Sequence, residues 1–131
     1  DLVRSRGLGD VYKRQTVQSR YVPEQSQPRT HQYVFAYHVR IENQGSATVQ
    51  LKTRHWIITD GLGVIRQVEG EGVVGEQPTL RPGQAFEYTS GSSLPTQRGN
   101  MRGSYRMQRD DGTSFDAEIP VFTLEMPFSL N

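Results

Sequence analysis

A strict alternation of apolar and polar side chains over residues 33–41 constrains the fold of this chain more than any other feature. The apolar side chains of this stretch are Tyr33, Phe35, Tyr37, Val39 and Ile41. His38 and Arg40 fall on the opposite face. A period of two residues indicates a β-strand with one buried face. Because no segment shows a sustained 3.6-residue period with helix caps, we expect an all-β protein.

Turn signals divide the rest of the chain into short strands. They include Asn43-Gln44-Gly45, Asp60-Gly61, Pro82-Gly83 and Asp111-Gly112. We count seven to eight strands between such turns, and 131 residues are a usual length for one domain. The pattern predicts an antiparallel β-sandwich of the immunoglobulin or fibronectin-type-III kind.

The second long strand carries the only tryptophan of the chain, and its alternation changes phase. The apolar residues are odd-numbered at Val49 and Leu51 but even-numbered at Trp56 and Ile58. A slip of one residue would turn every following side chain to the other face of the sheet. We therefore predict a bulge or bend near Thr53–His55, with the tryptophan anchoring the core.

The two ends of the chain depart from this pattern. Residues 1–15 hold four of the fifteen Lys and Arg residues and show no sustained period. We interpret them as a leader that is disordered or not native to the domain, which we place at residues 16–131. Near the other end, we expect Pro120 to interrupt the strand before it, with a last short strand or a tail following.

Composition removes several classes of function. There is no cysteine, so no disulfide, thiolate metal site or cysteine nucleophile can form. No run of 18 apolar residues and no secretory signal is present, so we expect a cytoplasmic protein with no membrane contact. The net charge of +1 gives no reason to expect binding to nucleic acid.

A glycine motif, G-x-G-x-x-G, runs from Gly70 to Gly75 in what we expect to be a loop over Gly70–Pro78. In a dinucleotide site such glycines approach a pyrophosphate at a helix N-terminus. Here a proline follows closely, no helix can start, and three glutamates would repel phosphate. The motif is therefore better interpreted as a glycine loop at one end of the sandwich. As a candidate binding site it comprises Gly70, Glu71, Gly72, Gly75 and Glu76.

Metal binding and catalysis have little support in the sequence. Glu69, Glu71 and Glu76 could meet a hard cation such as Mg²⁺, but their spacing matches no calcium loop. The histidines stand too far apart in sequence to suggest a metal pair. No serine or carboxylate pair stands out as a hydrolytic centre. We therefore expect no catalytic residue, no resident metal, no cofactor and no enzymatic activity.

Binding to another protein is the interpretation that we favour. Sandwich domains carry function on their end loops or on an open sheet edge that pairs with a partner strand. Four arginines on predicted strands could form a rim around such a surface, although a solvated outer face is the more common place for any one of them. They are Arg54, Arg66, Arg102 and Arg106.

Several blocks of sequence together resemble the bacterial ApaG family, also called CorD. They are Tyr21–Ser26, Tyr33–Tyr37, Ile41–Asn43, Arg54–Asp60, Gly70–Pro78, Leu80–Gly83, Phe86–Gly91, Met101–Tyr105 and Ile119–Leu124. The resemblance covers about residues 16–127, nearly the whole domain.

The resemblance implies a sandwich of about seven strands and an association with cobalt resistance and magnesium efflux. It also implies a protein-interaction module, because related domains occur beside an F-box and in a protein that interacts with a DNA polymerase. The partner would be another protein or, in a homodimer, a second copy of the chain. The alternative is a nucleotide, pyrophosphate or divalent-cation site on the Gly70–Pro78 loop.

Overall fold

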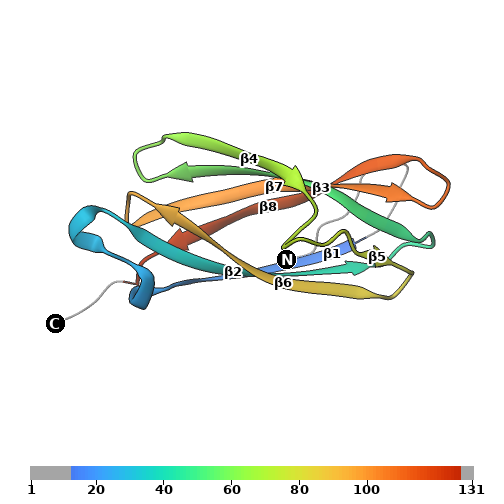
Figure 1. Ribbon diagram of the computed structural model, residues 1–131, viewed down its shortest axis with the longest axis horizontal. Helices are drawn as coiled ribbons and strands as arrows, with labels where there is room; N and C mark the ends of the chain where they lie inside the picture. The colour runs from blue at the N-terminus through green and yellow to red at the C-terminus, as the bar shows by residue number, and fades with distance from the viewer. Residues whose placement is uncertain (1–12, 128–131) are drawn as a thin grey trace.

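The computed structural model describes residues 13–127, which form a sandwich of two antiparallel sheets (Figure 1). The strands are β1 (Lys13–Tyr21), β2 (Tyr33–Asn43), β3 (Val49–Asp60), β4 (Ile65–Glu71), β5 (Thr79–Leu80), β6 (Ala85–Leu94), β7 (Arg98–Arg109) and β8 (Ser114–Glu125). Two 3-10 turns, η2 (Pro23–Gln25) and η3 (Pro28–Thr30), join β1 to β2. The expected all-β sandwich of seven to eight strands is confirmed. Over the described range, no helix is long and apolar enough to cross a membrane.

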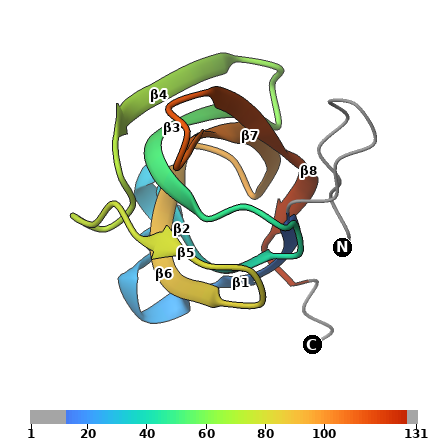
Figure 2. The same ribbon diagram turned by 90° about the vertical axis from the view of Figure 1, so that its right-hand side faces the viewer.

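The two sheets leave one side of the sandwich closed and the other open. One sheet has the order β1-β2-β6, and the other β4-β3-β7-β8, with β5 paired to the start of β3. On the closed side β1 lies against β8, and the Ser19 hydroxyl donates to the Thr123 carbonyl at 2.8 Å. On the other side the edges are β4 and β6, which face each other without pairing (Figure 2). We call β4, β6 and the cleft between them the open side.

The predicted alternation of β2 is confirmed by its burial, which is complete at every second residue. Trp56 is only 3% exposed and packs edge-on against rings from both sheets. Its ring centroid lies 5.4 Å from that of Tyr37, 5.9 Å from Phe122 and 6.2 Å from Tyr105. The tryptophan therefore anchors the core, as the sequence predicts.

The phase change of β3 is a β-bulge. The register between β3 and β7 shifts between Leu51 and Thr53, so Lys52 is the extra residue, just before the predicted span. Leu51 points into the core before the bulge and Trp56 after it. Arg54 has the same parity as Trp56, so the bulge turns the arginine toward the interior of the sandwich.

Two boundaries differ from the sequence-based expectations. The expected interruption at Pro120 is wrong: β8 continues through it, and the register with β7 shifts there so that a bulge forms. A proline is tolerated at a bulge of an edge strand because the missing N–H costs little there. At the other end, β1 begins at Lys13, so residues 13–15 of the interpreted leader pair with residues 41–43. Residues 1–12 lie outside the described part of the chain.

Candidate functional site

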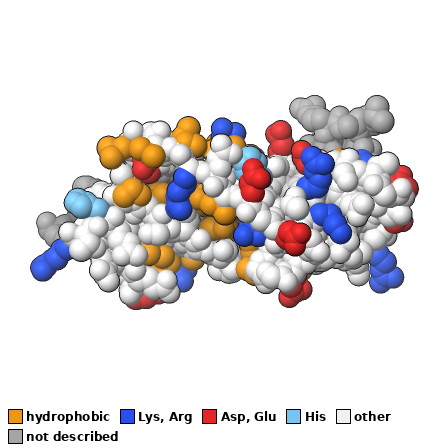
Figure 3. Space-filling model, turned by 45° about the horizontal axis from the view of Figure 1, so that its top comes forward, with side chains coloured by type: hydrophobic (Ala, Val, Ile, Leu, Met, Phe, Trp, Pro, Cys, Tyr) orange, Lys and Arg blue, Asp and Glu red, His pale blue; other side chains and the backbone are white. Residues whose placement is uncertain are grey.

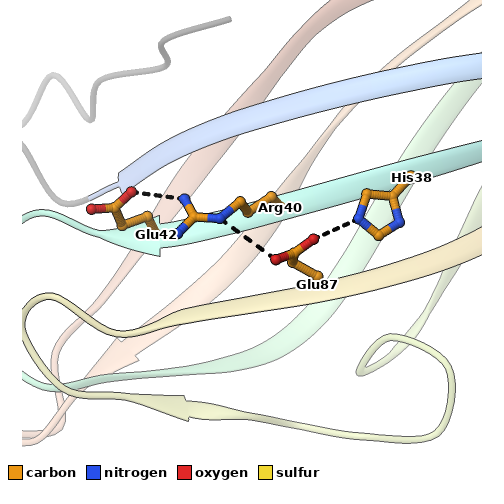
Figure 4. Close-up of polar contacts among 4 residues, drawn as sticks. All are labelled: His38, Arg40, Glu42 and Glu87. Carbon is orange, nitrogen blue, oxygen red and sulfur yellow. Dashed lines mark hydrogen bonds and ion pairs between the residues drawn. The ribbon is translucent and has the colours of Figure 1, made fainter.

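The outer face of the three-stranded sheet carries a chain of paired charges (Figure 4). His38 Nε2 lies 2.7 Å from Glu87, whose other oxygen is 3.6 Å from Arg40 Nε. Arg40 also donates to Glu42 at 2.8 Å, and His38 Nδ1 lies 2.8 Å from the Thr89 hydroxyl. These groups satisfy one another, so this face has the character of a solvated outer surface.

Charged and polar side chains on the outer face of the five-stranded sheet also pair with one another. It contains a shallow hollow of about 430 Å³ beside Gly70. Arg106 pairs with Asp116 at 2.9 Å, and His55 Nε2 lies 2.7 Å from the Gln67 side chain and 3.6 Å from Glu69. Within residues 13–127 no three His, Asp or Glu side chains gather in a way that could hold a metal ion.

The open side has a different chemistry. A cleft of about 290 Å³ lies between β4 and β6. The apolar side chains that line it are Trp56, Ile58, Val68 and Met101. Its polar lining is Tyr37, Arg54, Arg66, Ser90, Ser92 and Ser93. Figure 3 shows this side of the molecule, with hydrophobic side chains between Lys and Arg side chains along its middle.

The Arg54 guanidinium lies at one end of the cleft, in a space formed by residues 70–76, which we call the glycine segment. Its Nη1 donates to the carbonyl oxygens of Glu71 and Gly72, at 3.1 and 3.0 Å. A Cβ added at Gly70 would lie 2.8 Å from both Nη atoms, so the missing side chain makes room for the guanidinium. The first glycine of the motif is thus explained by an arginine of the neighbouring strand.

The expected loop over Gly70–Pro78 is too long by two residues. Gly70 and Glu71 belong to β4, where they pair with Arg54 and Thr53, because the ladder with β3 continues past the glycine. The loop begins at Gly72, whose φ of +65° is left-handed.

The rest of the motif forms a tight two-residue turn. Val74 and Gly75 both have positive φ, at 44° and 81°. Val73 and Glu76 on either side exchange N–H···O bonds of 2.8 and 2.9 Å. Positive φ at both central residues matches a type I′ turn, and it is strained for the β-branched Val74. The segment is therefore ordered by its own hydrogen bonds.

These bonds decide what the glycine segment can offer a ligand. The amides of Gly72, Val73 and Glu76 already donate to protein carbonyls, and the carbonyls of Glu71 and Gly72 face Arg54. A pyrophosphate needs free N–H donors and positive charge. The candidate residues do lie together, but they present acceptors and carboxylates, which is a poor match for a phosphate.

The two left-handed glycines of the motif give a matched test of this structural role. A Cβ at Gly72 would lie 2.3 Å from the Glu76 carbonyl oxygen, whereas one at Gly75 would meet nothing within 4 Å. We expect Gly75→Ala to lower the free energy of unfolding by about 1 kcal/mol, the usual penalty of left-handed backbone. Gly72→Ala carries the same penalty and must also displace the Glu76 carbonyl, so we expect it to lower the free energy of unfolding by about 2–3 kcal/mol. Urea denaturation of both variants checks this, and equal losses would contradict it.

Three tyrosines lie on the interior side of Arg54. The hydroxyls of Tyr88 and Tyr105 hydrogen-bond to each other, and the Tyr37 hydroxyl bonds to Ser90. Burial raises the pKa of all three phenols, while the positive charge of Arg54 acts in the opposite direction. No sequence signal pairs Tyr88 with Tyr105, because the two residues stand on different sheets.

A group of exposed apolar side chains marks the end of the β3–β4 hairpin. Leu62 is 80% exposed, Val64 62% and Ile65 58%. The Asp60 carboxylate accepts the N–H groups of Leu62 and Val64, at 2.8 and 3.0 Å, so the turn that presents them is fixed. Hydrophobic side chains gather at the upper left of Figure 3. This patch was not predicted from the sequence, although apolar residues inside a glycine turn were its signal.

The predicted rim of four arginines does not form as one surface. Arg54 and Arg66 line the cleft of the open side, and Arg54 also borders the hollow beside Gly70. Arg102 and Arg106 line hollows on the outer face of the five-stranded sheet. For Arg54 the reason is the bulge at Lys52, which turns this side chain toward the cleft.

Comparisons with known proteins agree with this architecture. A family model described as the ApaG domain matches residues 23–109. Protein ApaG of Rhodospirillum centenum is 57% identical over 114 residues, which cover 87% of this chain and 88% of that protein. Protein ApaG of Pseudomonas aeruginosa is 56% identical over 115 residues, covering 88% and 91%. A crystal structure of an ApaA protein from Bordetella pertussis superimposes with a TM-score of 0.86 at 53% identity, covering 89% of this chain and 95% of that one.

Proposed function

The chain belongs to the ApaG family, and from this premise we propose that it is a non-catalytic protein-interaction module that binds its partner on the open side of the sandwich. The observation that carries the proposal is the apolar group of Leu62, Val64 and Ile65, exposed at the end of an edge strand. Exposed apolar patches on soluble domains commonly mark sites of protein contact.

The neighbouring strand adds a second means of recognition. β4 pairs with β3 alone within the described residues, so its other edge offers backbone N–H and C=O groups. A partner could bury the hairpin patch and hydrogen-bond to this edge at the same time. Burial of the patch would supply affinity and the edge would supply orientation.

In this proposal the protein performs no reaction and holds no cofactor. Its partner is another protein or a second copy of the chain, and the complex forms in the cytoplasm. Any influence on cobalt resistance or magnesium efflux then passes through that partner. The lack of a three-ligand cluster of His, Asp or Glu within residues 13–127 supports this indirect route.

A double variant in the hairpin patch, with an exposed valine of β8 as the control, tests the binding surface. Val64 is 62% exposed on the open side, and Val121 is 60% exposed on β8, where it lines a hollow on the outer face of the five-stranded sheet. We expect Leu62→Ser with Val64→Ser to reduce crosslinked partner from a bacterial lysate at least tenfold, because burial of about two apolar side chains is lost. Val121→Ser should leave capture unchanged. If capture falls equally in both, or in neither, the hairpin is not the binding surface.

A further inference from the structure

We propose that the open edge of β4 takes up an extended segment of a partner protein that carries an acidic, an apolar and an acidic residue at alternate positions. The inference rests on the proposed function and names the chemistry of the partner at that same surface. It follows from three features of β4: the side chains on its inner face, the charges near them and the direction of its free backbone groups.

The inner face of β4 presents a cation, an apolar group and a second cation. Arg66, Val68 and Gly70 are alternate residues of the strand, so they share one face. Arg66 and Val68 line the cleft, and the Arg54 guanidinium occupies the space over Gly70. The outer two positions are four residues apart, about 13 Å along a strand. An added strand with acidic residues four positions apart has the same spacing.

The two arginines have no acidic partner within the described residues. Arg40, Arg98 and Arg106 each pair with a carboxylate, whereas no carboxylate oxygen lies within 4.0 Å of Arg54 or Arg66 in residues 13–127.

Their hydrogen bonds go to neutral acceptors instead. Arg54 Nη1 donates to two carbonyls, and within residues 13–127 its Nε and Nη2 donate to no acceptor. Arg66 reaches across the cleft to the Ser93 carbonyl at 2.7 Å. A carboxylate is a stronger acceptor for a guanidinium than a carbonyl, so both cations would gain from an acidic ligand.

The backbone of β4 is oriented to receive a strand. The Val64 carbonyl accepts from Asp60, and the Gly72 amide donates to the Lys52 carbonyl, so even-numbered residues point toward β3. The direction alternates along an antiparallel strand. The N–H and C=O groups of Ile65, Gln67 and Glu69 therefore point away from β3, toward the free edge. A strand that pairs there places alternate side chains beside Arg66, Val68 and Gly70.

The outer face of the same strand restricts the register. Glu69 and Glu71 lie on that face, opposite to the arginine side. Acidic residues on the outer face of an added strand would meet these glutamates, and like charges on neighbouring strands are unfavourable. Acidic side chains are thus favoured on the inner face alone, which makes the four-residue spacing a requirement.

Two peptides of identical composition test the spacing. Thr-Glu-Thr-Val-Thr-Glu-Thr puts both acidic residues and the valine on one face, whereas Thr-Glu-Thr-Thr-Glu-Val-Thr puts the acidic residues on opposite faces. Amide NMR titration of the full chain should show saturable shifts along β4 with the first peptide and at least tenfold weaker binding of the second. Equal binding of both, or shifts away from β4, would overturn the inference.

Arginine variants locate the charge contact. Arg66→Gln should weaken the binding of the first peptide about fivefold to tenfold, because one charge-assisted hydrogen bond is lost. Arg102→Gln, on the outer face, is the matched control and should change nothing. If both variants bind alike, or if β4 shifts with concentration in the absence of peptide because two copies pair there, the inference fails.

The outcome separates this inference from the proposed function. If neither peptide binds while the Leu62 and Val64 variants still lose the crosslinked partner, the open side remains the binding surface and only the acidic segment is refuted. If the first peptide binds on β4 but those variants retain the partner, the segment is supported and the role of the hairpin patch is refuted.

Discussion

Trp56→Ala is expected to lower the free energy of unfolding by about 3–5 kcal/mol. The indole is 3% exposed and contacts the rings of Tyr37, Tyr105 and Phe122, so its removal leaves a cavity that walls from both sheets cannot close. Gly103 of β7 lies opposite Trp56, and a Cβ there would lie 2.1 Å from the His55 carbonyl oxygen, so the backbones of β3 and β7 are already in close contact beside the indole. The free energy of unfolding of a domain of this size is about 5–15 kcal/mol in total, so the variant will be only marginally stable.

Urea denaturation followed by far-ultraviolet circular dichroism measures this loss without depending on the removed fluorophore. Trp56→Phe keeps an aromatic ring in the core and should lose less than half as much. Leu62→Ala, at a side chain that is 80% exposed, should change the free energy by less than about 0.5 kcal/mol. A loss below about 1 kcal/mol for Trp56→Ala would show that the indole does not join the two sheets.

The core could be predicted from the sequence because it depends on local periodicity. The alternation of β2 and the phase change of β3 are both visible in a single chain, and the structure places Phe35 and Trp56 inside accordingly. The same phase change also implies that Arg54 points inward. That consequence was missed because an arginine at a strand position is more often solvated. In addition, Gly70, which makes room for the guanidinium, lies 16 positions away in the sequence.

The candidate site could be predicted only in part because its parts meet through the sheets. The glycine motif looks like a ligand-binding loop in the sequence. In the structure Gly70 makes room for the Arg54 guanidinium, and Gly72 accepts a hydrogen bond from it and begins the turn that follows. The cleft forms because β4 and β6 are edge strands on the same side of the sandwich. The sequence of a single strand does not show which strands it pairs with. The contact between Tyr88 and Tyr105 likewise joins two sheets, so no local pattern announces it.

Above pH 10 the protein is expected to lose stability steeply. Burial raises the pKa of Tyr88 and Tyr105 well above the ordinary value, and the charge of Arg54 only partly offsets this. The unfolded chain releases these protons near pH 10, while the folded protein retains them. The stabilisation is therefore fully present below pH 10 and falls as the pH rises, by about 1.4 kcal/mol per pH unit for each tyrosine. Together the pair removes about 2.8 kcal/mol per pH unit.

Urea denaturation at pH 9 and pH 11, with tyrosinate absorbance as a second signal, measures this slope. The double variant Tyr88→Phe with Tyr105→Phe removes both titrating groups and should flatten it to the contribution of the remaining tyrosines. Near pH 7 the double variant should be almost as stable as the parent, because both partners of one buried hydrogen bond leave together. Tyr105→Phe alone should be less stable than the double variant by about 1–2 kcal/mol, since the Tyr88 hydroxyl then stays buried without its partner. A double variant that keeps the full alkaline slope would assign the loss to groups outside this pair.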